Sequence, residues 1–502
     1  MVCNILAYLK EAYIACPDKI AFADMETTLT YRQLWERTRA AGTKIHRLID
    51  GRRREPIFVC IGKNTASITA FLAVVAAGCF YVPIDTTLPD HRLAEIFRTM
   101  KPKLVICTQS DMRALPFPNV QTVTLEQLCE TQADETVLER LYSLALDTDP
   151  LYCIFTSGST GVPKGVLVGH RSVIDMTEQF SKVFPISSDT IFGNQAPFDF
   201  DVSVKDIYLS LKNQATVYIL EKQLFSSPKR LIERMNQEQI NTLIWSVSAM
   251  KIVSALKTFR SIVPEYVRLV MFSGEALPCK ILSEWQENLP QAKFVNLYGP
   301  TEITCNCTYY KVEHRFANDE ILPIGIPLPN TGILLLDGDR EVVEPGQIGE
   351  ICVSGSCLAL GYYHNEERTV SAFCQNPLQT AWPERIYRTG DLGRWSEDGN
   401  LLFLGRSDSQ VKYMGFRIEL GEIEAAVNSV PFIDSACCLF DHDKEQICLF
   451  YQATKKDDKA VVEALKQILP AFMIPKRIYY YEMLPANRTG KIDRTALKQA
   501  HL

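Results

Sequence analysis

Apolar residues with helical spacing alternate with short β-branched runs through the first part of the chain. The helical pattern covers 31–48 and 67–77, whereas 57–61 and 104–107 are short continuous apolar runs, typical of buried strands. A second region of the same kind extends from 172 to 272, with expected strands at 216–220 and 243–245 and a helix at 228–239. Alternation of helices and strands predicts parallel sheets covered by helices, an α/β fold.

The pattern changes after about residue 321. Gly and Pro become closely spaced, and short strands such as 332–337 and 349–354 predict a β-rich subdomain that completes a large N-terminal domain. The remaining residues show strand, helix and strand signals over 423–429, 447–451 and 461–469. We therefore expect layered α/β subdomains with a β-rich subdomain over 1–405, and a small α+β C-terminal domain over 406–502, with the boundary near Asp408.

Composition narrows the possible functions. The net charge of −6 over 502 residues argues against a general nucleic-acid binder, which needs a basic surplus. The 16 cysteines include no Cys-x-x-Cys pair, so we expect reduced thiols in the cytoplasm and no metal bound to them. Residues 64–84 carry no charge, but the stretch is Ala-rich and contains Gly78 and Pro83, which favours a buried helix and strand over a membrane span.

Residues 153–165 contain the most informative candidate for chemistry, a hydroxyl-rich loop that follows an apolar run and reaches Lys164. Glycines, hydroxyls and a lysine in this order are typical of a loop that binds phosphate. It is not a Walker loop, because Pro163 stands where that pattern needs glycine and Gly165 stands where it needs a hydroxyl. Taken alone, the loop is equally consistent with a flexible turn.

Six more unusual strings follow this loop in order. They are Phe200-Asp201-Val-Ser203, Asn296-Leu-Tyr298-Gly299-Pro300-Thr301-Glu302, Gly349-Glu350 with Gly361-Tyr362, Tyr387-Arg-Thr-Gly390-Asp391, Gly405-Arg406-Ser-Asp408 leading to Glu424, and Thr489-Gly490-Lys491-Ile-Asp493-Arg494. The set resembles the adenylate-forming superfamily of acyl-CoA synthetases, luciferases and peptide-synthetase adenylation domains. Within it the chain is most similar to free-standing amino-acid adenylation enzymes such as D-alanine:carrier-protein ligases.

The resemblance implies ATP and Mg²⁺ as cofactors, with Glu302 as the metal ligand and Thr301 beside it at the reacting centre. It implies that the loop holds the β- and γ-phosphates and that Asp391 accepts the ribose hydroxyls with help from Arg406. The residues implied to bind nucleotide are Thr156, Ser157, Gly158, Ser159, Thr160, Gly161, Lys164, Gly274, Glu275, Ala276, Asn296, Leu297, Tyr298, Gly299, Pro300, Asp391, Phe403 and Arg406.

The resemblance makes Lys491 the catalytic cation, which bridges the incoming carboxylate and the α-phosphate. An isolated lysine near the end of a chain is usually just exposed, but the residues around Lys491 match the family's turn. The family's hinge falls at Asp408, so the resemblance implies a mobile C-terminal domain that presents Lys491 for adenylation and withdraws it for thioester formation.

Asp201 indicates the substrate class. Family members that activate amino acids hold the α-ammonium with an aspartate at this place, and a buried aspartate requires such a partner. The alternative is that Asp201 caps a helix beginning at Val202 or Ser203, with Asp199 as the exposed member of the pair.

The other implied pocket residues are Val202, Lys205, Ile244, Met271, Ser273, Leu297, Cys305 and Asn306. Lys205 is similar to the lysine of pockets for acidic side chains, but pairing with Asp206 or exposure to solvent is an equal alternative. D-alanine ligases carry cysteine at the place of Ser273 and a neutral residue at that of Lys205, so D-alanine specificity does not follow.

The function implied is activation of an amino acid as its adenylate and transfer to a phosphopantetheine thiol. Because the chain ends soon after Arg494, we expect the thiol on a separate carrier protein, or coenzyme A as the alternative. An acyl- or aryl-CoA ligase and a non-catalytic nucleotide-binding scaffold remain rival interpretations.

Overall fold

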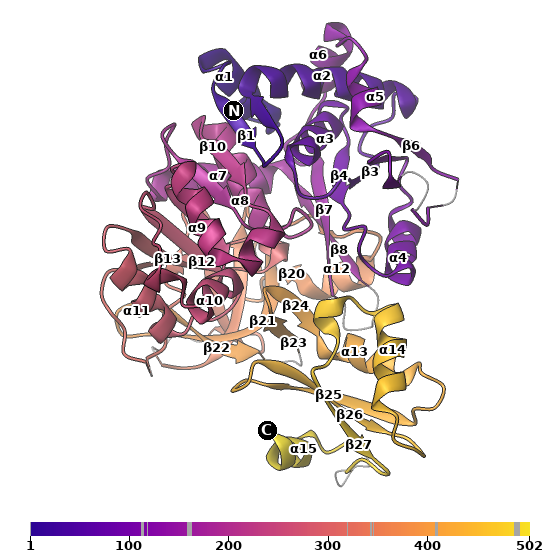
Figure 1. Cartoon of the computed structure of the whole chain (residues 1–502), viewed down its shortest axis with the longest axis vertical. Helices are drawn as coiled ribbons and strands as arrows, with labels where there is room; N and C mark the ends of the chain where they lie inside the picture. Colours follow the sequence, from indigo (N-terminus) through magenta and orange to yellow (C-terminus); the bar gives the residue numbers. More distant parts are fainter. Residues whose placement is uncertain are drawn as a thin grey trace. The chain divides into compact units, whose positions relative to one another are not determined.

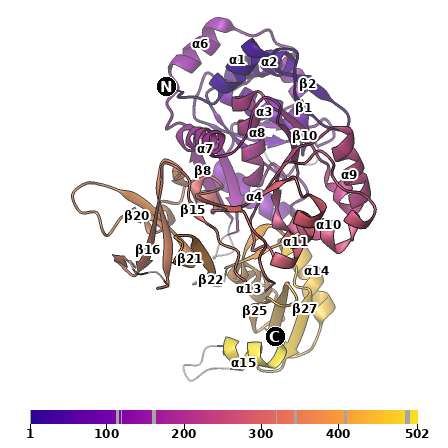
Figure 2. The same ribbon diagram turned by 90° about the vertical axis from the view of Figure 1, so that its left-hand side faces the viewer.

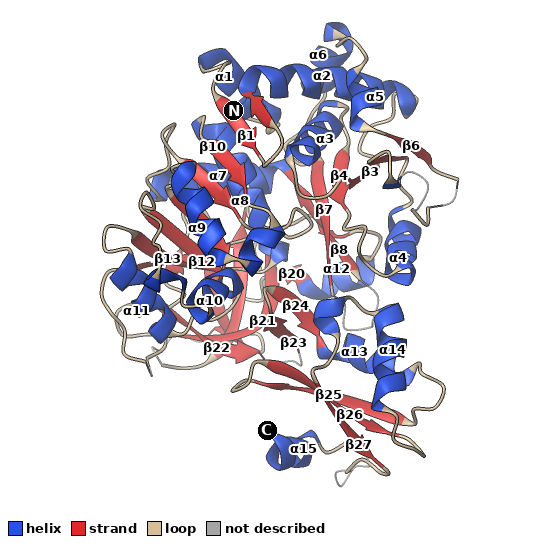
Figure 3. Ribbon diagram, viewed as in Figure 1, coloured by secondary structure: helices blue, strands red, loops and turns tan. Residues whose placement is uncertain are grey.

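The computed structural model describes all residues except 1, 112–114, 118, 158–162, 319, 342–343, 345, 407–409 and 486–491. The chain divides into two compact units. The first comprises Met1–Asp85, Met100–Ile154 and Val166–Ser407, and the second comprises Thr86–Thr99, Phe155–Gly165 and Asp408–Leu502. Figure 1 labels the helices and strands, and Figure 3 distinguishes them by colour.

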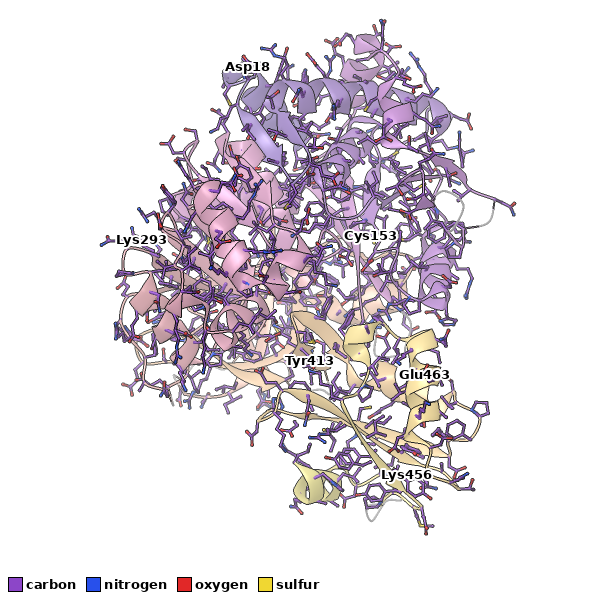
Figure 4. The ribbon with its side chains drawn as sticks, viewed as in Figure 1. Asp18, Cys153, Lys293, Tyr413, Lys456 and Glu463 are labelled. Atoms are coloured by element: carbon purple, nitrogen blue, oxygen red, sulfur yellow. The ribbon has the colours of Figure 1, made fainter. Side chains whose placement is uncertain are left out.

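A seven-stranded sheet has the order β19-β8-β7-β4-β3-β5-β6. Its strands are β3 (Pro56–Cys60), β4 (Phe80–Pro83), β5 (Leu104–Cys107), β6 (Gln121–Val123), β7 (Pro150–Thr156), β8 (Lys164–Gly169) and β19 (Gly361–Tyr362). The helices of this region are α2 (Tyr31–Leu48), α3 (Thr65–Ala76), α5 (Leu125–Cys129) and α6 (Glu135–Ser143). Cys153 of β7, labelled in Figure 4, is fully buried. The predicted helices and strands at 31–48, 57–61, 67–77 and 104–107 are therefore confirmed.

Helix α2 begins with a capping box, in which the Thr30 side chain accepts from the Gln33 backbone and the Gln33 side chain accepts from the Thr30 backbone. Helix α3 is buried along almost its whole length, which explains its lack of charge. The two helices pack together, as both views show (Figures 1 and 2). Residues 64–84 are thus a buried helix and strand, and no helix in the described part of the chain is long and apolar enough to cross a membrane.

A nine-stranded sheet has the order β15-β14-β13-β12-β11-β9-β10-β1-β2. Its strands are β1 (Ile20–Ala23), β2 (Thr28–Thr30), β9 (Ile191–Asn194), β10 (Thr216–Ile219), β11 (Thr242–Ser246), β12 (Leu269–Ser273), β13 (Lys293–Tyr298), β14 (Thr308–Val312) and β15 (Ile326–Pro327). The helices of this region are α1 (Leu6–Ala15), α7 (His170–Val183), α8 (Val202–Asn213), α9 (Pro228–Gln237), α10 (Val247–Ala255) and α11 (Cys279–Asn288). The strands from β9 to β13 are parallel to one another in this sheet, as the α/β prediction requires.

The predicted β-rich subdomain is a six-stranded antiparallel sheet. It contains β16 (Thr331–Asp337), β17 (Arg340–Glu341), β18 (Gly349–Gly355), β20 (Phe373–Gln375), β21 (Arg385–Trp395) and β22 (Leu401–Arg406), with α12 (Glu366–Ala372) between β19 and β20. It completes a large N-terminal domain of several sheets.

The second unit contains the small α+β C-terminal domain. Its elements are α4 (Asp90–Met100), β23 (Gln410–Tyr413), β24 (Phe416–Glu419), α13 (Leu420–Asn428), β25 (Ser435–Asp441), β26 (Gln446–Gln452), α14 (Asp458–Ile468), β27 (Arg477–Tyr481) and α15 (Arg494–His501). The predicted strand, helix and strand at 423–429, 447–451 and 461–469 are wrong. Apolar residues recur three and four apart in the first and last of these segments, which form helices, and the middle one is a continuous apolar run that forms a strand.

Candidate active site

Four of the predicted pocket residues lie on one face of the nine-stranded sheet. Ile244 of β11 is paired with Met271 of β12, and Met271 with Val295 of β13. Residues two apart on a strand share a face, so Ser273 and Leu297 lie on the same side. All four predicted side chains are buried. Parallel strands present their carboxyl ends at one edge, the usual place for a ligand in this kind of sheet.

Helix α8 adds three polar side chains to this region. Asp201, Lys205 and Tyr208 are spaced at i, i+4 and i+7, so they share one helix face. Asp201 occupies the N-cap position, yet its side chain makes no capping hydrogen bond. The helix-capping interpretation of Asp201 is therefore wrong, and the residue is buried at the start of the helix.

Lys205 is completely buried, which contradicts the solvent-exposed alternative. Its Nζ donates to Asn306 Oδ1 at 2.8 Å. The Asp206 alternative is also not realised as an ion pair: Asp206 Oδ2 accepts from Asn194 Nδ2 at 2.7 Å. Burial raises the pKa of Asp206 to about 7, although the charges of Lys205 and Lys63 oppose this shift.

A tight turn after β13 brings Cys305 and Asn306 back to the sheet edge. Thr304 and Cys305 both have positive φ, 59° and 78°, and Cys305 Sγ donates to the Asp201 carbonyl at 2.9 Å. A Cβ on Gly299 would lie 2.7 Å from Asn306 Cα, so only glycine permits this close approach. The turn thus places Asn306 against Lys205.

Glu302 lies in the same turn, within a short 3₁₀ helix over Thr301–Ile303. Its carboxylate is fully buried, and Oε1 accepts from Tyr362 Oη at 2.8 Å. The Glu302 carbonyl also accepts from Ala359 N at 2.8 Å. No cluster of three metal-ligating side chains occurs among the described residues. A single buried carboxylate fits Mg²⁺ because this ion commonly takes its other ligands from phosphates and water.

Asp391 is held on both carboxylate oxygens. Tyr298 Oη donates to Oδ2 at 2.6 Å, and Arg406 Nη1 donates to Oδ1. The Asp391 side chain is 1% exposed and that of Arg406 is 9% exposed. A carboxylate has about four acceptor positions, so ribose hydroxyls remain possible ligands. The Phe403 ring lies 6.1 Å from that of Tyr298, centroid to centroid.

The remaining predicted nucleotide residues of the first unit lie at the carboxyl ends of β12 and β13. Asn296 Nδ2 donates to the Pro323 carbonyl at 2.8 Å, which uses one of the two amide donors. Gly274 has φ of 102°, and Ala276 is exposed. Glu275 accepts from Ser248 Oγ at 2.8 Å.

The candidate phosphate loop belongs to the second unit. Thr156 ends β7, and its buried Oγ1 has no hydrogen-bond partner within the described structure. Ser157 Oγ donates to the Arg417 carbonyl, and Lys164 is buried at the start of β8. The predicted residues Gly158, Ser159, Thr160, Gly161, Asp408 and Lys491 lie outside the described residues.

Family models match most of the chain. The model of the AMP-binding enzyme covers residues 9–363, and that of the AMP-binding enzyme C-terminal domain covers 422–491. The chain belongs to the AMP-binding enzyme family. The predicted resemblance to adenylate-forming enzymes is thereby confirmed.

Individual relatives agree with this assignment. The chain is 33% identical over 506 residues to a D-alanine--D-alanyl carrier protein ligase of Bacillus licheniformis, with 96% of each chain covered. It is 30% identical over 509 residues to tyrocidine synthase 1 of Brevibacillus parabrevis, a match that includes 99% of this chain and 45% of that longer protein. The adenylation domain AlmE of Vibrio cholerae has the same fold, with a TM-score of 0.83 at 24% identity over 100% of this chain and 98% of that one.

Three tyrosines near the pocket were not predicted. Tyr81 and Tyr152 are cross-strand neighbours on β4 and β7, and the hydroxyls of Tyr81 and Tyr208 are 2.8 Å apart. The Tyr152 hydroxyl is buried without a hydrogen-bond partner in the described structure. Burial, with the nearby Cys305 and Asp201, raises the pKa of Tyr152. Tyr81 and Tyr152 stand in apolar runs, which indicate a core and not a site.

Lys63 was also missed, and it fixes the segment that leads to Asp201. Its Nζ donates to the carbonyls of Asn194, Gln195 and Leu220 at 3.1, 2.8 and 2.7 Å. Burial lowers its pKa to about 7. The expectation that Asp199 is exposed is wrong, because this residue is only partly exposed and burial raises its pKa to about 6.

Proposed function

We propose that this protein activates an amino acid as its aminoacyl-adenylate, with release of pyrophosphate from ATP. The acyl group then passes to the phosphopantetheine thiol of a separate carrier protein. The observation that carries the proposal is Asp201, a buried aspartate at the start of α8 whose side chain does not cap the helix. Similarity to a D-alanine carrier-protein ligase and to a tyrocidine synthase supports the same chemistry.

In this proposal separate residues bind the amino acid, the ribose of ATP and the metal ion. Asp201 binds the α-ammonium, which orients the α-carboxylate toward the nucleotide. Asp391, already fixed by Tyr298 and Arg406, accepts the ribose hydroxyls. Glu302 would hold Mg²⁺, which lowers the repulsion between the two anionic reactants when bound. Tyr362 orients the Glu302 carboxylate.

The loop after β7 has the residues to bind the departing phosphates. Thr156 offers a hydroxyl without another partner in the described structure, and Lys164 offers a buried charge. We assign Lys491 as the cation that bridges the attacking carboxylate and the α-phosphate, on a domain that moves about a hinge near Asp408. Lys491→Ala should abolish adenylate formation but spare thioester formation from supplied acyl-adenylate. Equal loss of both steps would refute this role.

The proposal is tested by ATP–pyrophosphate exchange with a panel of amino acids and simple carboxylic acids. Exchange with at least one amino acid and not with the simple acids is expected. Exchange only with simple acids would indicate an acyl- or aryl-CoA ligase instead. No exchange with any acid would leave a nucleotide-binding scaffold.

A further inference from the structure

Lys205 is a buried cation whose charge is not balanced by an ion pair. Its side chain is 0% exposed, and no carboxylate of the described residues lies within ion-pair distance of its Nζ. Its hydrogen-bond acceptor is the neutral amide oxygen of Asn306. An unpaired charge in the interior is costly, so a protein retains one where a ligand balances it.

The neighbouring amide adds a second unsatisfied donor. Asn306 is 3% exposed, and its Nδ2 has no hydrogen-bond partner in the described structure, although Oδ1 of the same group accepts from Lys205. An ammonium and an amide N–H therefore lie side by side with no acceptor between them among the described residues. Two adjacent donors, one of them charged, match the paired acceptor oxygens of a carboxylate.

Asp206 is not that acceptor. It follows Lys205 directly on α8, so the two side chains leave the helix about 100° apart. Its Oδ2 accepts from Asn194, and its buried Oδ1 has no hydrogen-bond partner in the described structure, so Asp206 does not accept from Lys205. Asn306 accepts a hydrogen bond from Lys205, Cys305 and Asp206 are close enough to interact with its charge, and Asp201 and Tyr208 share its helix face.

The spacing of the Asp201 and Lys205 charges indicates which ligand would fit between them. Asp201 and Lys205 are four residues apart on one face of α8, a rise of about 6 Å along the axis. A ligand between them would carry an ammonium at one end and an anion at the other. The pocket residues Ile244 and Met271, on the neighbouring strands β11 and β12, are apolar and buried.

We propose that the amino acid activated by this protein has a carboxylate in its side chain, of the aspartate or glutamate class, bound by Lys205 and the Asn306 amide. This inference rests on the proposed function. It excludes alanine-sized substrates, because these would leave the Lys205 charge and the Asn306 donor unpaired after binding.

The test is ATP–pyrophosphate exchange with D- and L-aspartate and glutamate against asparagine, glutamine and alanine. We expect kcat/KM for one acidic amino acid to exceed that for its amide by about 100-fold or more, because the amide leaves a buried charge unpaired. Lys205→Met should lower kcat/KM for the acidic amino acid by about 100-fold. The value of kcat/KM for the amide should stay the same or rise. Lys212→Met is the matched control, since Lys212 lies on the same helix and pairs with Glu178 at 2.8 Å.

The outcomes separate this inference from the proposed function. Preference of the natural protein for a neutral amino acid would overturn the acidic substrate and leave amino-acid activation standing. Equal activity of Lys205→Met and Lys212→Met on the acidic substrate would also overturn it. No exchange with any amino acid would refute the proposed function itself. If Lys205→Met does not fold, the ratio of acid to amide measured on the natural protein still decides.

Discussion

Asp391 and Lys205 are two buried charges in the same unit, and their surroundings differ. Asp391 has a donor on each carboxylate oxygen, one from Tyr298 and one from Arg406. Lys205 has a neutral acceptor and stands beside an amide donor without a partner in the described structure. Groups of the protein stabilise the Asp391 charge, whereas we expect a ligand to pair with the Lys205 charge.

This difference separates two ways of building a site. A charge satisfied by its own protein is held in position before the ligand arrives, which suits a group that binds an invariant part such as a ribose. A buried charge without a charged partner in the protein indicates the chemistry of the ligand that would pair with it. We therefore predict that removing a partner of Asp391 lowers the stability of the protein. Adding a charged partner beside Lys205 should raise it.

Arg406→Met should give the largest effect, because it leaves the Asp391 carboxylate buried without its cation. We expect the free energy of unfolding to fall by about 3–5 kcal/mol, measured by urea denaturation. Arg32→Met is the control: its partner Asp18 is 81% exposed, so the loss should stay below about 1 kcal/mol. Similar losses in both variants would mean that the buried Arg406–Asp391 pair stabilises the protein no more than the exposed Arg32–Asp18 pair does.

Asp206→Asn tests the titration of the group next to Lys205. The pKa of Asp206 is raised from 3.8 to about 7, so the folded protein binds a proton that the unfolded chain releases between these values. The contribution of Asp206 to stability is therefore largest below pH 4 and is lost as the pH rises to 7. Between pH 4 and 7 the stability of the natural protein should fall relative to Asp206→Asn by about 2–4 kcal/mol. A constant difference would contradict the raised pKa.

Tyr298→Phe removes one donor to Asp391 and keeps the ring against Phe403. The free energy of unfolding should fall by about 1.5–3 kcal/mol, as expected for a hydrogen bond to a charged group. Arg406 remains, so the loss should be smaller than that of Arg406→Met. A larger loss would assign the main stabilisation of Asp391 to the tyrosine.

Asn306→Asp supplies Lys205 with the carboxylate that it lacks. The free energy of unfolding should rise by about 1 kcal/mol in the absence of substrate, because the buried ammonium gains a charged acceptor. The variant should also lose the preference for an acidic amino acid. A fall in stability would indicate that the Lys205 charge is already balanced in the natural protein.

The fold was predictable where the sequence period was unambiguous. The helix at 31–48 and the strand at 104–107 were predicted to the residue, because caps and polar residues bound them. The C-terminal assignments at 423–429, 447–451 and 461–469 were wrong because these segments are short, so the helical spacing of apolar residues in the first and last of them repeats over only about two turns. There the spacing of the apolar residues, and not their number, determines helix or strand.

The candidate site was predictable only for residues within recognisable strings. Glu302, Asp391 and Arg406 stand in such strings, whereas Tyr152 and Lys63 stand in segments that look like core and loop. Their roles depend on contacts across more than fifty residues of sequence, such as the bonds from Lys63 to the strand ends near Asn194. The partner of Lys205 likewise lies 101 residues away, so the sequence could not choose among its alternatives.

The most direct test of the central claim, amino-acid activation through Asp201, compares the natural protein with Asp201→Asn in ATP–pyrophosphate exchange. The substrates are the amino acid that the panel identifies and the same acid without its ammonium. We predict that the natural protein prefers the amino acid by about 100-fold or more, and that Asp201→Asn loses this preference. Equal use of both acids by the natural protein, or unchanged preference in Asp201→Asn, would contradict the claim.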